Sequence, residues 1–235
     1  MTFLEMLDSY WLYFLIGRYP EGPLGGLALT LLLAAAGLLL ALPVGLLLGL
    51  ARISAQRWLS LPVSGLIYIV RGTPLLMVVF WAYFFLPGIT GIKTDQFTTM
   101  LLALVLFNGV YLAEIVRAGI QGLPKGQVEA ARSLGLSQGE TLRFVLLPQA
   151  LRQMLPSLVN QSVSTIKETS LGYIIGLTEV SQVATQINTL VFVFPAQIYL
   201  MLAASYFFLC FGLSRLAYRL ELRLGRKAAP VRSSP

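Results

Sequence analysis

Apolar residues gather in five stretches of this chain, each long enough to be considered as a membrane span. They lie at about residues 24–50, 59–86, 97–116, 150–177 and 192–217. The second is interrupted by a polar break at residues 71–74, and the fourth carries polar residues inside it. The pattern predicts an all-α membrane protein with about five transmembrane helices, formed by residues 24–223.

The leading segment, residues 1–23, has a different character. It begins with Glu5 and Asp8 rather than with the Lys or Arg of a signal peptide. Tyr10, Trp11 and Tyr13 follow, and such rings favour the boundary between lipid and water. We therefore expect an amphipathic helix lying at the membrane interface.

The composition agrees with a membrane protein. Of 235 residues, 57% are hydrophobic and only 11% are charged, where a soluble domain carries about a quarter. The single cysteine excludes a disulfide within the chain, and the absence of histidine excludes histidine catalysis and histidine metal ligands. We predict no catalytic residues and no metal site. The net charge of +7 is explained by its distribution and does not indicate nucleic acid binding.

Basic residues alternate in number between the connections, which predicts the orientation. Most basic residues follow the first, third and fifth stretches: Arg52 and Arg57; Arg117, Lys125, Arg132, Arg143 and Arg152; and Arg215, Arg219, Arg223, Arg226, Lys227 and Arg232, the last three in the basic tail at 224–235. The other connections hold only Lys93. Because cytoplasmic loops carry the excess of Lys and Arg, we expect an external amino terminus and a cytoplasmic carboxyl terminus.

Small residues recur every four positions in the first stretch, at Gly37, Ala41, Gly45 and Gly49. A stripe of this kind lets another helix approach closely. Packing within the chain is favoured over a seam between two copies.

The polar break is Arg71-Gly72-Thr73-Pro74. Thr73 is expected to cap a helix that has Pro74 at its first position. From Pro74 to Leu86 that helix would be about 20 Å long, too short to cross about 30 Å of hydrocarbon. We therefore predict a broken span, with residues 60–70 supplying the rest. For Arg71, pairing with carbonyls or with a carboxylate is favoured over substrate binding.

The longest polar connection, at about 119–148, is predicted to form two short helices around a tight bend. Glu129, Ala130 and Ala131 favour helix, and Gly135 is suited to a left-handed helix end. Ser137 with Glu140 has the spacing of a capping box at the start of the second helix. Pro148 is expected to end that helix.

The same connection resembles a known family. Glu129-Ala130-Ala131 is followed after three residues by Gly135 and, further on, by Leu147-Pro148. This order resembles the cytoplasmic coupling loop of permease subunits in ABC (ATP-binding cassette) importers, where the ATPase docks. Arg71-Gly72-Thr73-Pro74 and the run from Lys167 to Leu171 resemble the polar amino acid subgroup, with its histidine, glutamine and arginine permeases. Glu168 stands where that subgroup often has Asp.

The resemblance implies the type I ABC importer permease fold and a place in the bacterial inner membrane. It also implies a permease subunit that moves a polar amino acid into the cytoplasm. Its partners would be a second permease chain, identical or related, two ABC ATPase subunits, and a soluble or lipid-anchored substrate-binding protein. The chain has no phosphate-binding loop, so ATP and Mg²⁺ would be used by the ATPase and no cofactor by this chain.

A polar stripe in the fourth stretch is the candidate substrate path. Ser157, Gln161, Ser164 and Glu168 are spaced four, three and four residues apart, which places them on one helical face beside Lys167. Lys167 would meet a substrate carboxylate and Glu168 an amino group. The alternative is that Lys167 and Glu168 neutralise groups such as Glu114 in the third stretch, or groups of a partner subunit.

Two other functions compete with transport. One is a membrane assembly or regulatory subunit, which the coupling loop disfavours. The other is an intramembrane enzyme. Ser170 and Lys167, three residues apart, would be its nucleophile and base, although a polar pathway explains the pair equally well. Residues 178–195, external by the charge argument, are predicted to form a gate, a contact for the binding protein or an ordinary polar loop.

Overall fold

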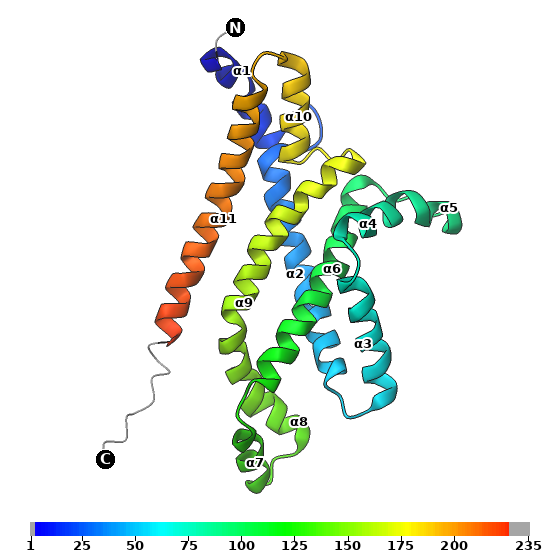
Figure 1. The fold of residues 1–235 in the computed structure, drawn as a ribbon, viewed down its shortest axis with the longest axis vertical. Coiled ribbons are helices and arrows are strands. Elements are labelled where there is room, and N and C mark those ends of the chain that lie inside the picture. The colour runs from blue at the N-terminus through cyan, green and yellow to red at the C-terminus, as the bar shows by residue number, and fades with distance from the viewer. Residues whose placement is uncertain (1–2, 226–235) are drawn as a thin grey trace.

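The computed structural model describes residues 3–225. Within that range the regular secondary structure is helical, with two isolated β-bridges. Figure 1 shows long helices running between two ends of an elongated molecule. The helices are α1 (Phe3–Ile16), α2 (Gly26–Arg52), α3 (Arg57–Arg71), α4 (Leu75–Phe80), α5 (Leu86–Thr90), α6 (Gln96–Gln121), α7 (Lys125–Ser133), α8 (Gln138–Glu140), α9 (Leu147–Glu168), α10 (Val180–Val191) and α11 (Pro195–Gly225). Two π-helical segments, Trp81–Phe85 and Thr141–Leu146, and a 3₁₀ segment, Thr169–Ile175, join some of them.

Three of the described helices are long and apolar enough to cross a membrane: α2, α6 and the Pro195–Leu216 part of α11. The bent pair of Arg57–Arg71 and Leu75–Thr90 would make a fourth if it is one span. Helix α9 has 22 residues, but its polar side chains keep it out of this group. The all-helical membrane fold is as expected, whereas the fifth crossing stays a prediction.

The second apolar stretch is broken at the predicted place. Helix α3 ends at Arg71, α4 begins at Leu75, and the two halves meet at an angle of 100°. The predicted cap is wrong: the Thr73 hydroxyl donates to the Ile69 carbonyl at 2.9 Å, and Pro74 lies at the N-cap rather than inside the helix. Proline disfavours helical geometry in the residue before it, which favours an end of the helix at Thr73.

Each π-helical segment ends two residues before a proline. Trp81–Phe85 precedes Pro87, and Thr141–Leu146 precedes Pro148. Proline donates no backbone hydrogen bond and its ring crowds the preceding turn, and a wider turn is one way to accommodate it. The prediction that Pro148 ends the second loop helix is therefore wrong. The helical path from Gln138 continues through Pro148 to Glu168.

The stripe of small residues lies against α6. Gly37, Ala41, Gly45 and Gly49 are all buried on α2, which places the stripe inside this chain. A methyl group at Gly45 would clash with the Leu112 side chain, and one at Gly49 would lie 2.8 Å from Val116 Cβ. The favoured interpretation, packing within the chain, is thus the one the structure has.

Residues 178–195 contain a helix, α10, that the sequence analysis left open. The buried Glu179 carboxylate begins it by accepting from the backbone N–H groups of Ser181 at 3.0 Å and Gln182 at 2.9 Å. Tyr206 on α11 donates to the same carboxylate at 3.1 Å. The Glu179 cap stabilises the start of α10. The helix is amphipathic, and its apolar face packs against α1 and α11.

Helix α1 forms where the interfacial helix was expected, but it is not a free surface helix. Met6 and Phe14 are buried against Val183 and Ile187 of α10. Figure 1 shows α1 and α10 together at the end of the molecule opposite α7 and α8.

The glycine contacts generate a stability prediction. Gly45→Ala should lower the stability of the detergent-solubilised protein by about 1–3 kcal/mol, because the added methyl overpacks the seam between α2 and α6. The matched control is Gly65→Ala on α3, where a Cβ meets nothing within 4 Å. That control should be neutral or stabilising, since Ala favours helix by up to about 1 kcal/mol. Thermal unfolding curves compare them, and equal stabilities would contradict this packing account.

Candidate substrate path and coupling loop

The bend of the loop has the predicted chemistry. After α7 the chain turns at Gly135, whose φ of +83° is left-handed, and the N–H of Leu136 reaches the Ala131 carbonyl at 3.2 Å. With the bond from Gly135 N–H to the Arg132 carbonyl at 3.0 Å, this is the Schellman arrangement that closes a helix.

The second helix begins at the predicted capping box. Glu140 N–H donates to the Ser137 hydroxyl at 3.3 Å, and Ser137 N–H donates to the Glu140 carboxylate at 2.8 Å. Hydrogen bonds from Ser137 hold the pKa of Glu140 below its usual value. The bend is therefore held from both sides by local backbone geometry.

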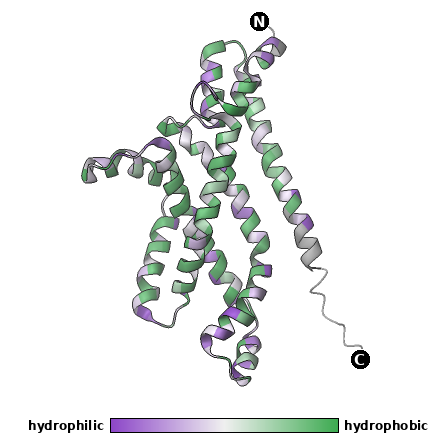
Figure 2. Cartoon of the chain, turned by 180° about the vertical axis from the view of Figure 1, so that it is seen from behind, coloured by the Kyte–Doolittle hydropathy of each residue, from purple (hydrophilic) through white to green (hydrophobic). Residues whose placement is uncertain are grey.

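The base of the loop packs against the membrane helices, and its tip is polar. Ala131 is buried, while Glu129 and Ala130 are exposed on α7. Leu147 and Pro148 form the first turn of α9, where Leu147 packs against a buried cluster shared with α6. Figure 2 shows the polar residues gathered at this end of the molecule.

Two large apolar side chains stand out on this polar surface. Leu134 is 83% exposed and Phe144 is 63% exposed. Neither exposed side chain was predicted from the sequence. An exposed apolar side chain at the tip of a projection is suited to insertion into a partner.

A buried amide, Asn108, organises the polar stripe and was missed from the sequence. It has no exposed surface on α6. Its Oδ1 accepts from Gln161 Nε2 and Thr165 Oγ1, both at 2.7 Å, and its Nδ2 donates to Glu168 Oε2 at 3.1 Å. The sequence did contain a signal for this site. Asn108 is a strongly polar residue within the apolar part of the third stretch, and polar residues inside membrane spans often mark functional or packing sites.

The four predicted path residues differ in their contacts. Gln161 and Glu168 converge on Asn108, whereas Ser164 makes no side-chain contact of this kind within the described residues. Lys167 is exposed and forms no ion pair with any described residue. Its charge is therefore available to a ligand or to a partner subunit.

The candidate nucleophile and base pair is not assembled. The Ser170 hydroxyl donates to the backbone carbonyl of Lys167 at 2.6 Å and not to its amino group. Lys167 lies in the last turn of α9, and Ser170 lies in the 3₁₀ segment that follows. This geometry gives no support to an intramembrane enzyme.

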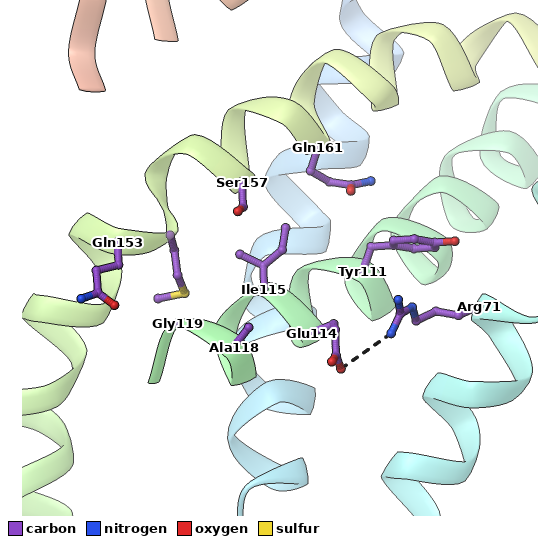
Figure 3. A pocket seen from close by; sticks show the side chains of 10 residues that line it. Arg71, Tyr111, Glu114, Ile115, Ala118, Gly119, Gln153, Ser157 and Gln161 are labelled. Carbon is purple, nitrogen blue, oxygen red and sulfur yellow. Dashed lines mark ion pairs between the residues drawn. The ribbon is translucent and has the colours of Figure 1, made fainter. Parts of the chain in front are cut away.

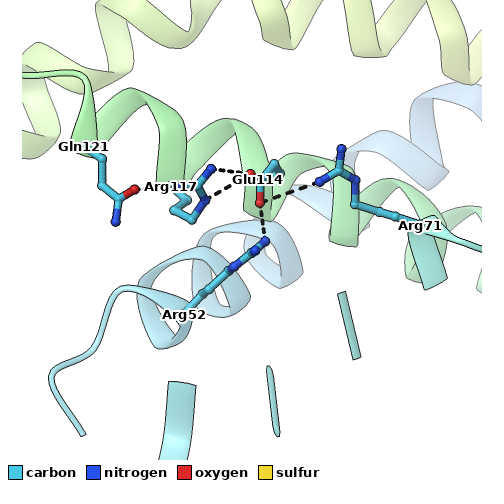
Figure 4. A network of polar contacts seen from close by, with 5 residues as sticks. All are labelled: Arg52, Arg71, Glu114, Arg117 and Gln121. Carbon is cyan, nitrogen blue, oxygen red and sulfur yellow. Dashed lines mark hydrogen bonds and ion pairs between the residues drawn. The ribbon is translucent and has the colours of Figure 1, made fainter. Parts of the chain in front are cut away.

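Glu114 has partners other than those considered from the sequence. Figure 4 shows Arg52 of α2, Arg71 of α3 and Arg117 of α6 around this one carboxylate. Arg52 and Arg117 both hydrogen-bond it, Arg117 from Nε at 3.0 Å. The alternative in which Lys167 neutralises Glu114 is wrong, because nearer arginines already do so.

Arg71 is the looser member of this cluster. Its Nη1 lies 3.8 Å from the Glu114 carboxylate and its guanidinium lies 5.4 Å from the centre of the Tyr111 ring. The rest of the motif shapes the break: Gly72 ends α3, Thr73 bonds back to it, and Pro74 starts α4.

Comparison with known proteins identifies the family of this chain. Residues 41–226 match the family described as binding-protein-dependent transport system inner membrane component. The chain belongs to this family. It is therefore a permease component of a bacterial membrane transporter.

Curated relatives extend the match. The probable glutamine ABC transporter permease protein of Bacillus subtilis is 39% identical over 216 residues, covering 88% of this chain and 98% of the relative. The glutamate transport system permease protein of Corynebacterium glutamicum is 39% identical over 207 residues, covering 86% of this chain and 76% of that one.

A solved structure of an amino acid ABC transporter with histidines superposes with a TM-score of 0.84. It is 32% identical in sequence, and the superposition covers 95% of this chain and 99% of that one. The resemblance to ABC importer permeases and the type I permease fold, both expected from the sequence, are confirmed.

The polar network generates a functional prediction. Asn108→Leu should remove the shared partner of Gln161, Thr165 and Glu168 and cost about 1–3 kcal/mol for each buried group left unpaired. Uptake by the assembled complex should fall at least about tenfold, since 1.4 kcal/mol corresponds to that factor. The control is Leu106→Asn, an exposed position on the same helix. Normal uptake by the Asn108 variant would show that the network has no part in transport.

Proposed function

We propose that this chain is the membrane-spanning permease subunit of an ATP-driven importer that moves a polar amino acid into the cytoplasm. The observation that carries the proposal is a polar network, centred on Asn108, inside a fold that closely matches an amino acid ABC transporter. Relatives named for glutamine and glutamate transport support this class of substrate.

The complex would contain a second permease chain, identical or related, and two ABC ATPase subunits that use ATP and Mg²⁺. A soluble or lipid-anchored binding protein would deliver the amino acid. A second chain is supported by α11, whose exposed apolar residues include Phe207, Phe208 and Phe211. Lipid or a second subunit must cover this surface in a membrane.

Coupling would pass through the 119–148 loop. The ATPase would contact α7 and the Gly135 bend, with Glu129 and Ala130 on the docking surface and Ala131 beneath it. Leu147 and Pro148 lie at the start of the helix that ends at Glu168. Movement of the loop would therefore reach the path along one helix, without an intervening hinge of coil.

Substrate would pass along the α9 face that holds Gln161, Ser164, Lys167 and Glu168. The exposed Lys167 ammonium is suited to the substrate carboxylate. Glu168, held by Asn108, is suited to the substrate amino group. A charged residue within a span costs about 2.5–3.5 kcal/mol on insertion scales, so both charges are best explained by a cavity or a partner.

The proposed orientation places the amino terminus outside and the basic tail inside. The connection after α2 and the α7–α8 loop lie at one end of the molecule, and α1 and α10 at the other (Figure 1). The basic connections thus share one end, which supports the positive-inside argument.

Coupling is tested at Gly135 and Glu129. Gly135→Val forces a β-branched residue into a left-handed conformation, which costs about 1–2 kcal/mol, and Glu129→Lys reverses a charge on the docking surface. Each variant should reach the membrane and lose at least about fivefold of both uptake and ATPase stimulation, since roughly 1 kcal/mol gives such a factor.

The control for Gly135 is Gly139→Val, at an α8 glycine with open space and no positive φ that lies outside α7 and the Gly135 bend. It should keep both activities. If the Gly135 and Glu129 variants also keep parental uptake, the loop takes no part in coupling.

Orientation is tested with reporter fusions. Fusions at Ser9, Thr94, Gly126, Gln186 and Ser233 should report outside, outside, inside, outside and inside, because the basic connections stay in the cytoplasm. Alkaline phosphatase and green fluorescent protein give opposite signals for the two sides. An internal signal at Gln186 would contradict both the orientation and the five-span count.

A further inference from the structure

A cavity of about 380 Å³ lies between α3, α6 and α9, apart from the Lys167 and Glu168 end of the stripe. Known pockets for small ligands span about 300 to 1,000 Å³, so this space is large enough for an amino acid. Figure 3 shows Ser157 and Gln161 of α9 on one side, facing Arg71, Tyr111 and Glu114 on the other.

The α3 and α6 wall of the cavity belongs to a charge cluster in which positive charge is in excess. One carboxylate, Glu114, is shared among Arg52, Arg71 and Arg117. Of these arginines, only Arg71 lines the cavity. Its side chain is 39% exposed, and it makes no hydrogen bond with any described residue.

Arg71 is therefore a planar donor held in place with its hydrogen-bonding capacity unused. The Tyr111 ring and the distant Glu114 carboxylate fix its position. A guanidinium presents donors in a fork that matches a carboxylate in a bidentate manner. The wall thus offers what an anionic group of a small ligand needs.

The opposite wall offers acceptors. The Gln161 side chain donates to Asn108 through Nε2, and its side-chain oxygen Oε1 has no partner among the described residues. Ser157 is exposed and lines the same cavity. A ligand with a carboxylate on one side and an ammonium on the other matches this arrangement.

We propose that this cavity is a second amino acid subsite, in which Arg71 binds the α-carboxylate and the α9 acceptors receive the ammonium group. The proposal rests on the proposed function and places the subsite between the Asn108 network and the loop end of the chain. Gln161 belongs to both, so an amino acid leaving Glu168 would enter this cavity next. Arg71, which the sequence analysis favoured as structural, would then also bind substrate.

The test uses the assembled complex in nanodiscs, with Ala118→Cys, an exposed position on the α6 side of the cavity, in a Cys210→Ala background. The neutral reagent methyl methanethiosulfonate modifies the introduced thiol, and mass spectrometry follows the rate. The probes are L-glutamine, L-glutamate and L-histidine. For glutamine and histidine, the decarboxylated forms γ-aminobutyramide and histamine, which lack any carboxylate, serve as controls. Uptake of the same three amino acids is measured in proteoliposomes in parallel.

A transported amino acid should slow modification at least about fivefold at saturation, and the decarboxylated controls should not, because the bidentate carboxylate contact is lost. Arg71→Gln should abolish the protection, and Arg71→Lys should retain part of it. Arg52→Gln is the matched control: it touches the same carboxylate but lies outside the cavity, so protection should persist. Ile115→Cys, also on the α6 side of the cavity, provides a second reporter if Ala118→Cys does not assemble.

Each other result overturns a distinct claim. Uptake of a probe without protection at either reporter overturns the subsite. Protection that survives Arg71→Gln, or that is lost equally with Arg52→Gln, overturns the role of Arg71 as a ligand. A parental complex that takes up none of the three probes argues against the proposed amino acid importer itself.

Discussion

The close approach of α2 and α6 is the constraint on which the rest of the structure depends. Glycines on α2 let the two backbones meet, with Gly45 against Leu112 and Gly49 against Val116. Only at this distance does Arg52, at the end of α2, reach Glu114 on α6. The same helix α6 then presents Asn108 to α9. Polar contacts in this chain are thus positioned by an apolar seam.

Three polar side chains connect different helices. Glu114 of α6 pairs with α2 and α3, Asn108 of α6 binds α9, and Glu179 binds α10 and α11. Little water is available inside a bilayer to replace such partners, so the pairs also specify which helices are neighbours. The contacts of Glu114, Asn108 and Glu179 therefore link helices at three separate places in the molecule.

Local signals were sufficient for much of this structure. Gly135, Ser137 and Glu140 act within a few residues of one another, so their bend and cap were predictable. The break at residues 71–74 was predictable for the same reason, although its 100° angle was not. Long-range partners were not predictable: nothing near Glu114 in sequence indicates Arg52, and nothing near Asn108 indicates Glu168. Pro148 was misjudged because a π-helical turn absorbs it.

The uninterrupted helical path from Gln138 to Glu168 ties the docking end to the Asn108 network by rotation as well as by distance. Each residue of an α-helix advances the facing direction by about 100°. Gain or loss of one residue between Pro148 and Gln161 would turn Gln161 and Glu168 away from Asn108 while leaving the loop unchanged. Evolution can therefore vary the loop surface and the path residues separately, but the number of residues between them is fixed by the geometry of the helix.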